Sequence, residues 1–139
     1  KIIAFEPVQN VFDCLKKNTK NLNIDYYQMI LSNQRSCANM LLDTNNTGNN
    51  IVDTNSFSTG KIKVNKLDNI DLPKFGLIKI DCQGHDFFVL DGAIKTLEKY
   101  KPIIVVEQEN TAIKSCNSLL VDLGARVICN VRKDFIYGW

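Results

Sequence analysis

The stretch LIKIDCQGHDFFVLDGA, residues 77–93, decides the fold of this 139-residue chain. It starts with the apolar run Leu77–Ile80 and passes through a polar turn that contains Gly84. After the turn, apolar residues recur at the spacing of one helix face, and this pattern ends near Tyr100, just before Pro102. A buried strand, a tight turn and an amphipathic helix form the repeating unit of α/β sheets. We therefore predict that Leu77–Ile80 is a central strand of such a sheet.

Strand and helix patterns alternate along the rest of the chain. Short apolar or β-rich runs predict strands, and apolar residues at i, i+3, i+4 and i+7 predict helices. The predicted strands are Ile2–Phe5, Ile24–Leu31, Cys37–Leu42, 62–67 and Ile103–Val106, the predicted helices are 8–15 and 113–123 with Gly124 as a C-terminal cap, and the predicted hairpin pairs 127–131 with 135–137. This order predicts a single α/β domain over residues 1–139. Its sheet is expected to be mostly parallel and buried on both faces, with an antiparallel hairpin at the C-terminal end.

Residues 43–60 interrupt the alternation with a very polar segment. Of the 17 residues between Asp43 and Lys61, 14 are Asn, Thr, Ser, Gly or Asp. Such a composition cannot bury itself, so we predict a long loop. Loops of this length inside a domain serve either as lids or as disordered surface segments, and both alternatives stay open.

Composition and charge argue against several kinds of partner and indicate a cellular compartment. The 17 basic and 15 acidic residues are interspersed and give a net charge of +2, so the chain has no basic stripe for nucleic acid. None of the apolar runs approaches the ~20 residues that a membrane span needs. The five cysteines form no C-x-x-C pair, which favours reduced thiols in the cytoplasm over disulfides or a zinc site. We expect no metal, no nucleic acid and no membrane partner.

The carboxyl ends of the predicted strands hold the candidate functional residues, because ligands bind there in parallel α/β sheets. Glu6 follows the first strand, where a carboxylate can accept both hydrogen bonds of a ribose diol. In the turn after Leu77–Ile80, Gly84 permits a tight bend, and either Asp81 or Asp86 is expected to cap the next helix. The third strand end carries Glu107, Gln108 and Glu109.

His85 is a candidate general base, because an imidazole titrates near neutral pH and this is the one histidine of the chain. Asp81 or Glu107 can do the same work. A histidine that opens a helix can equally have a structural role, so the identity of the base stays open at this point.

Five motifs follow one another in the order typical of a known family. They are AFEP (4–7), ILSN (30–33), K-LD-I (66–70), LIKIDCQGHDFFVLDGA (77–93) and KYKPIIVVEQEN (99–110). In this order the chain resembles the FkbM-type methyltransferases along nearly its whole length. The resemblance implies a Rossmann-like class I methyltransferase sheet. It also implies S-adenosylmethionine as cofactor and methyl transfer to a hydroxyl of a sugar or small metabolite.

The resemblance also implies roles for individual residues. Glu6 with Pro7 would hold the cofactor ribose, and Leu31 and Ser32 would border the adenine. The residues implied at the reacting centre are Asp81, which also contacts the cofactor, with Gln83 and His85, and those implied on the substrate side are Gln83, Glu107 and Glu109. At two positions where the family usually has glutamate, this chain has Gln83 and Asp86.

The first strand and glycine-rich loop of the class I fold have no counterpart in this sequence. We therefore expect this chain alone to bind the cofactor weakly. Two interior strands, one of them Ile2–Phe5, would then face each other across the missing strand, and they are expected to pair directly or to recruit a strand from another copy in a homo-oligomer. Two alternatives to an active methyltransferase remain. One is a methyltransferase-like domain with only a binding or assembly role, and the other is a different nucleotide-cofactor enzyme, such as a nicotinamide-dependent one that uses Glu6.

Overall fold

A computed structural model describes residues 1–107 and 113–139 and shows an α/β protein. The strands are β1 (Ile2–Phe5), β2 (Ile24–Tyr27), β3 (Ile30–Leu31), β4 (Ser36–Leu41), β5 (Ile51–Asp53), β6 (Ile62–Asn65), β7 (Leu77–Ile80), β8 (Ile103–Glu107), β9 (Arg126–Val131) and β10 (Asp134–Gly138). The helices are α1 (Gln9–Asn18), α2 (Asp86–Asp91), α3 (Ile94–Tyr100) and α4 (Ile113–Asp122), with short 3-10 turns η1 (Thr47–Asn49), η2 (Thr54–Ser56) and η3 (Leu67–Asn69).

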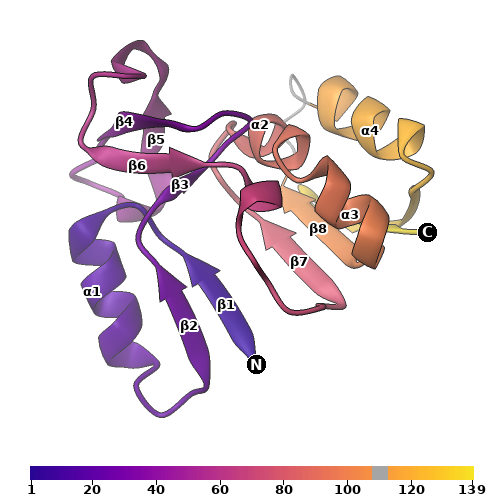
Figure 1. The fold of residues 1–139 in the computed structure, drawn as a ribbon, viewed down its shortest axis with the longest axis horizontal. Helices are drawn as coiled ribbons and strands as arrows, with labels where there is room; N and C mark the ends of the chain where they lie inside the picture. The colour runs from indigo at the N-terminus through magenta and orange to yellow at the C-terminus, as the bar shows by residue number, and fades with distance from the viewer. Residues whose placement is uncertain (108–112) are drawn as a thin grey trace.

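The strands form three small sheets, so the expectation of one mostly parallel sheet is wrong (Figure 1). β1 and β2 form a parallel pair. The main sheet has the order β7-β8-β10-β9 and is mixed, because β10 runs antiparallel to both of its neighbours. A second four-stranded sheet, here called the inserted sheet, has the order β3-β6-β4-β5.

β7 is an edge strand of the main sheet, which corrects the prediction that it is central. It pairs with β8 only, and β1 pairs with β2 only, so these two strands do not pair with each other. Each is hydrogen-bonded to its own parallel partner. The recruitment of a strand from another copy stays a prediction.

The main core lies on one face of the main sheet. Ile80, Ile104 and Val106 pack there against side chains from α2, α3 and α4, among them Leu90, Leu97 and Leu120. The side chains that point to the opposite face are more exposed, with Leu77 at 61% and Ile103 at 37%. The prediction that these strands are buried on both faces is therefore wrong, because all three helices that pack on this sheet lie on one side of it.

Residues 43–60 are ordered, although the sequence predicts a loop. They contain η1, β5 and η2, and β5 pairs antiparallel with β4. Polar side chains close the turns of this segment. The Asp43 carboxylate accepts hydrogen bonds from the Asn45 and Asn46 amides at 2.8 and 3.0 Å, and the Ser56 hydroxyl accepts one from the Asn39 amide at 2.6 Å. The polar side chains of this segment thus stabilise local turns, and they do so through Asx-type hydrogen bonds to the backbone.

Two other elements are divided where the sequence predicts continuity. The run 24–31 contains two strands in different sheets, and the helix after the 81–85 turn is split into α2 and α3. The split occurs at Gly92, where a Cβ would lie 2.0 Å from the carbonyl oxygen of Ser32. Only glycine permits this approach of β3 to the helix.

The positions of several predicted elements are confirmed. β1, α1, β8, α4 and the β9–β10 hairpin lie at the predicted positions. Beyond α4, Gly124 has a φ of +91°, which fits the predicted C-terminal cap. All five cysteines are free thiols. Within the described ranges, none of the helices is long and apolar enough to cross a membrane.

Candidate functional site at the strand ends

The carboxyl ends of β1, β7 and β8 point in the same general direction (Figure 1). Glu6 directly follows β1, Asp81 directly follows β7, and Glu107 is the last residue of β8. Because β7 and β8 are parallel neighbours, Asp81 and Glu107 come together. Burial raises the pKa of Cys82 in the 81–85 turn to about 12, and the charges of Asp86, Asp81 and Glu6 add to this effect.

Gln83 lies between the two carboxyl groups and bonds to both. Its amide nitrogen Nε2 donates to Asp81 Oδ1 at 3.2 Å and to Glu107 Oε2 at 3.4 Å. The Lys79 ammonium contacts Asp81 Oδ2 at 3.2 Å and Asp134 Oδ1 at 3.5 Å. The sequence-predicted residues Asp81, Gln83 and Glu107 therefore form one hydrogen-bonded group, here called the acidic group.

The two carboxyl groups of the acidic group differ in pKa. The hydrogen bond to Asp81 raises the pKa of Glu107, and burial and the Asp81 charge add to this effect. Burial pushes the pKa of Asp81 upward, but hydrogen bonds from Glu107, Lys79 and Gln83 together with the Lys79 charge lower it overall. Asp81 is therefore the more acidic carboxyl of the pair, and Glu107 is the one that takes up a proton first as the pH falls.

The backbone of the turn is held in an unusual conformation. Gln83 and Gly84 have φ angles of +49° and +89°, the left-handed region that costs a non-glycine residue some energy. Asp86 stabilises this turn, because its carboxylate accepts the Cys82 amide at 2.9 Å and the Gly84 amide at 3.1 Å. Asp86 is only 5% exposed. Asp86, one of the two residues expected to cap the helix, therefore accepts amides of the preceding turn instead. The N-cap residue of α2 is His85, and its side chain makes no cap hydrogen bond.

The His85 ring bonds to Ser32. Its Nε2 lies 3.0 Å from the Ser32 hydroxyl oxygen, and the two residues are 6% and 1% exposed. Its ring lies 4.9 Å from the Phe88 ring and 6.5 Å from the Phe57 ring. Burial lowers the pKa of His85 to about 4. The structure thus joins two predicted site residues, but in a pair separate from the acidic group.

Glu6 is half-buried at the end of β1. Its Oε1 accepts the Val8 amide at 2.7 Å across Pro7. Burial raises the pKa of Glu6, and the Val8 hydrogen bond opposes this only in part. A carboxylate held by a backbone amide at a strand end, with its Oε2 making no hydrogen bond to a described residue, suits the binding of a diol.

The remaining predicted residues are placed as follows. Leu31, the last residue of β3, is partly buried against the main core. Glu109 lies outside the described residues. In the part of the chain that the structure describes, no group of three or more His, Cys, Asp or Glu residues could hold a metal ion.

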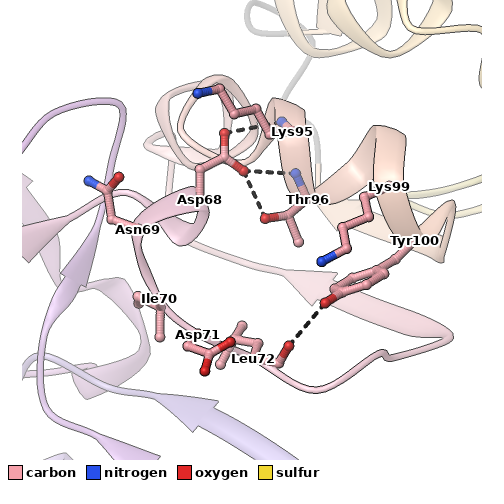
Figure 2. Close-up of a pocket in the computed structure, with 9 residues that line it drawn as sticks. All are labelled: Asp68, Asn69, Ile70, Asp71, Leu72, Lys95, Thr96, Lys99 and Tyr100. Carbon is pink, nitrogen blue, oxygen red and sulfur yellow. Dashed lines mark hydrogen bonds between the residues drawn. The ribbon is translucent and has the colours of Figure 1, made fainter.

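A pocket of about 380 Å³ lies away from the strand ends, between the 67–72 segment and α3 (Figure 2). Asp68 occupies one wall, and its carboxylate accepts the Lys95 amide at 3.1 Å, the Thr96 amide at 2.8 Å and the Thr96 hydroxyl at 2.7 Å. The Tyr100 hydroxyl donates to the Leu72 carbonyl at 3.0 Å. The polar groups that line this pocket are thus largely occupied by protein contacts. Sequence reasoning did not identify it, because its residues come from two elements with no shared motif.

The fold and the strand ends together define an α/β protein with an acidic, hydrogen-bonded site beside the carboxyl ends of parallel strands. A family model described as the methyltransferase FkbM domain matches residues 1–127. The chain therefore belongs to the FkbM methyltransferase domain family, as the resemblance of its motifs indicated.

The fold is similar to that of a solved family member. The crystal structure of methyltransferase FkbM from Methylobacillus flagellatus KT matches with a TM-score of 0.62 and 15% identity. The match covers 100% of this chain and 36% of that chain, so this chain spans about a third of the length of its structural relative. At this identity the likeness concerns the fold alone. A search of curated proteins finds no match.

Proposed function

We propose that this chain carries the ribose-binding acid and the acceptor side of an S-adenosylmethionine-dependent O-methyltransferase with a class I fold. The observation that carries the proposal is the acidic group at the ends of β7 and β8, with Glu6 at the end of neighbouring β1. The family assignment supports methyl transfer as the reaction class. A hydroxyl of a sugar or small metabolite is the proposed acceptor.

Glu6 would hold the ribose hydroxyls of the cofactor. The residues present fit this part of the group, because the acid is half-buried and one of its oxygens already accepts a backbone amide. When bound, the cofactor supplies an activated methyl group on a sulfonium. The protein then has to align the acceptor and remove its proton.

Asp81 is the proposed proton acceptor of the acidic group. Its lowered pKa keeps it ionised at neutral pH, where it can accept a hydrogen bond and then the proton from an acceptor hydroxyl. Lys79 and Gln83 orient its carboxylate from two sides. Glu107, the second carboxyl of the acidic group, can accept a hydrogen bond from another hydroxyl of the acceptor.

Ligand binding to this chain tests the proposal. Backbone amide resonances are followed by NMR during titrations with S-adenosylhomocysteine and, separately, with NAD, because NMR also detects weak binding. We expect S-adenosylhomocysteine to shift the resonances of residues 5–8 and 81–84, and NAD to shift neither group. Glu6→Ala should weaken the binding by about 1–3 kcal/mol, the usual cost of losing a hydrogen bond to a charged group.

Glu98→Ala is the matched control, because Glu98 is an exposed glutamate on α3 away from the strand ends. Shifts with NAD but not with S-adenosylhomocysteine would support the nicotinamide alternative. Binding that does not depend on Glu6 would remove this residue from the site, and no binding of either compound would contradict a cofactor role for this chain.

A further inference from the structure

We propose that His85 is a positioning residue that fastens the inserted sheet to α2 and so fixes the polar turn at the end of β7. Its pairing with Ser32 connects a strand end of the inserted sheet to the first turn of a core helix. The assignment of this turn to an active site rests on the proposed function. The contact between His85 and the inserted sheet does not depend on that function.

Two side-chain hydrogen bonds and one close backbone approach connect the inserted sheet to α2. The Ser32 hydroxyl bonds to His85, and the neighbouring Asn33 amide donates to Asp91 Oδ2 at 2.8 Å. Between them, the Ser32 carbonyl approaches Gly92 too closely for any side chain there. These contacts involve both ends of α2, which spans Asp86–Asp91, so the strand end lies along the helix in one defined position.

Aromatic contacts extend the fastening to a second part of the inserted sheet. Phe57, which directly follows η2, packs with the small core of Ile30, Ala38 and Val64. Its ring also faces His85, whose other neighbour is Phe88 on α2. The imidazole therefore contacts the inserted sheet through both a hydrogen bond and a ring contact.

His85 transmits this position to the acidic group through the backbone. It directly follows Gln83 and Gly84, both in the left-handed region, and its amide donates to the Cys82 carbonyl at 3.1 Å. A shift of the His85 ring would displace the backbone of Gln83 and Gly84. The Gln83 side chain would then move with its backbone. Asp86 also holds this turn from within α2, but its two carboxylate hydrogen bonds go to the turn itself and do not reach the inserted sheet.

This arrangement argues against His85 as the general base. A histidine that acts as a base needs a ring nitrogen that the acceptor hydroxyl can reach. Here Nε2 is bound to a buried hydroxyl and the residue is 6% exposed. The low pKa of about 4 agrees with a ring that stays neutral and acts as a hydrogen-bonding partner.

Ring nitrogen NMR of the unmodified protein tests the proposal without any variant. The chain has a single histidine, so its ring signals need no assignment. We expect one fixed tautomer and no titration between pH 5.5 and 8. A titration with a midpoint near 6.5, the ordinary histidine value, would show a solvated ring and overturn the proposal.

Two variants separate the hydrogen bond from the packing. His85→Phe keeps a ring between Phe57 and Phe88 but leaves the Ser32 hydroxyl without its partner. His85→Gln places an amide near the position of Nε2. We expect His85→Phe to speed amide exchange in residues 30–33 about tenfold and to shift the Gln83 and Gly84 resonances, because a buried polar group loses its partner. His85→Gln should restore most of both properties.

Removal of both partners gives a further control. Exchange in His85→Phe combined with Ser32→Ala should be slower than in His85→Phe alone, since no buried hydroxyl is then left unpaired. Unchanged exchange and unchanged turn resonances in His85→Phe would overturn the proposal. Because none of these measurements uses a cofactor or acceptor, they can fail or succeed independently of the proposed methyl transfer.

Discussion

Gln83 donates to two carboxyl groups at once and so connects Asp81 to Glu107. The neutral amide supplies a donor where a third acid would add only acceptors and charge. With Gln83 in place, Asp81 is bound by both an amide and the Lys79 ammonium, and Glu107 is bound by the same amide. Gln83 stands where the family usually has glutamate. It therefore removes one negative charge from the site, and its amide still bonds to both neighbouring carboxyl groups.

We predict that Gln83→Glu destabilises the protein at neutral pH but not in acid. The negative charge of the new carboxyl, close to Asp81 and Glu107, would raise the pKa values of all three groups. A carboxyl whose pKa is raised by folding costs nothing while it is protonated, below its unfolded pKa. Its cost appears as the pH rises through the folded pKa. At this exposed position we expect a loss of under about 1 kcal/mol at pH 7 and none near pH 3.5, measured by urea unfolding.

Gln34→Glu serves as the control for this substitution, because Gln34 is exposed in a turn away from the strand ends. An equal loss of stability at both pH values in Gln83→Glu would contradict the electrostatic explanation.

At the scale of elements, α3 depends on a cap from another part of the chain. Its N-cap residue, Ala93, has no side-chain oxygen and makes no cap hydrogen bond. Asp68 in η3 accepts the Lys95 and Thr96 amides in its place (Figure 2). The amide of Asp68 also donates to the Gly92 carbonyl at 3.0 Å, so η3 connects the end of α2 to the start of α3.

Asp68→Ala should therefore cost about 1–2 kcal/mol of stability, the range for loss of a helix cap. Chemical denaturation gives this value directly. Asp71→Ala is the matched control, since Asp71 is an exposed aspartate on the same pocket. Equal effects of the two substitutions would show that the cap contributes nothing specific.

At the scale of the whole molecule, β1 and β7 each have an unpaired edge, and one face of the main sheet exposes apolar side chains. Unpaired strand edges and exposed apolar surface both favour association. The proposal that follows is a homo-oligomer formed at these strands.

Sedimentation velocity should show an oligomer whose population grows with protein concentration. Leu77→Lys, which places a charge at the 61% exposed start of β7, should shift the population toward monomer. Leu22→Lys is the control, because Leu22 is 57% exposed but precedes β2 outside the main sheet. A monomer at every concentration would contradict the proposal.

Local patterns were sufficient to predict most elements and the contents of the acidic group. Asp81 and Glu107 could be paired from sequence because they end two consecutive strands that alternate with helices. Ser32 and His85 could not, because 53 residues separate them and only the position of the inserted sheet brings them together. The order within residues 43–60 was also missed, since composition does not show that Asp43 and Ser56 accept backbone amides.

The sequence by itself determined the family, the positions of most strands and helices, and the strand ends at which the polar residues gather. These follow from periodicity and spacing, which are local. Only the tertiary structure decided that three sheets form, that β7 is an edge strand, and that the one histidine is buried against a serine. These properties depend on which surfaces meet, and that is set by long-range packing, such as the close approach of Ser32 to Gly92, that no local pattern encodes.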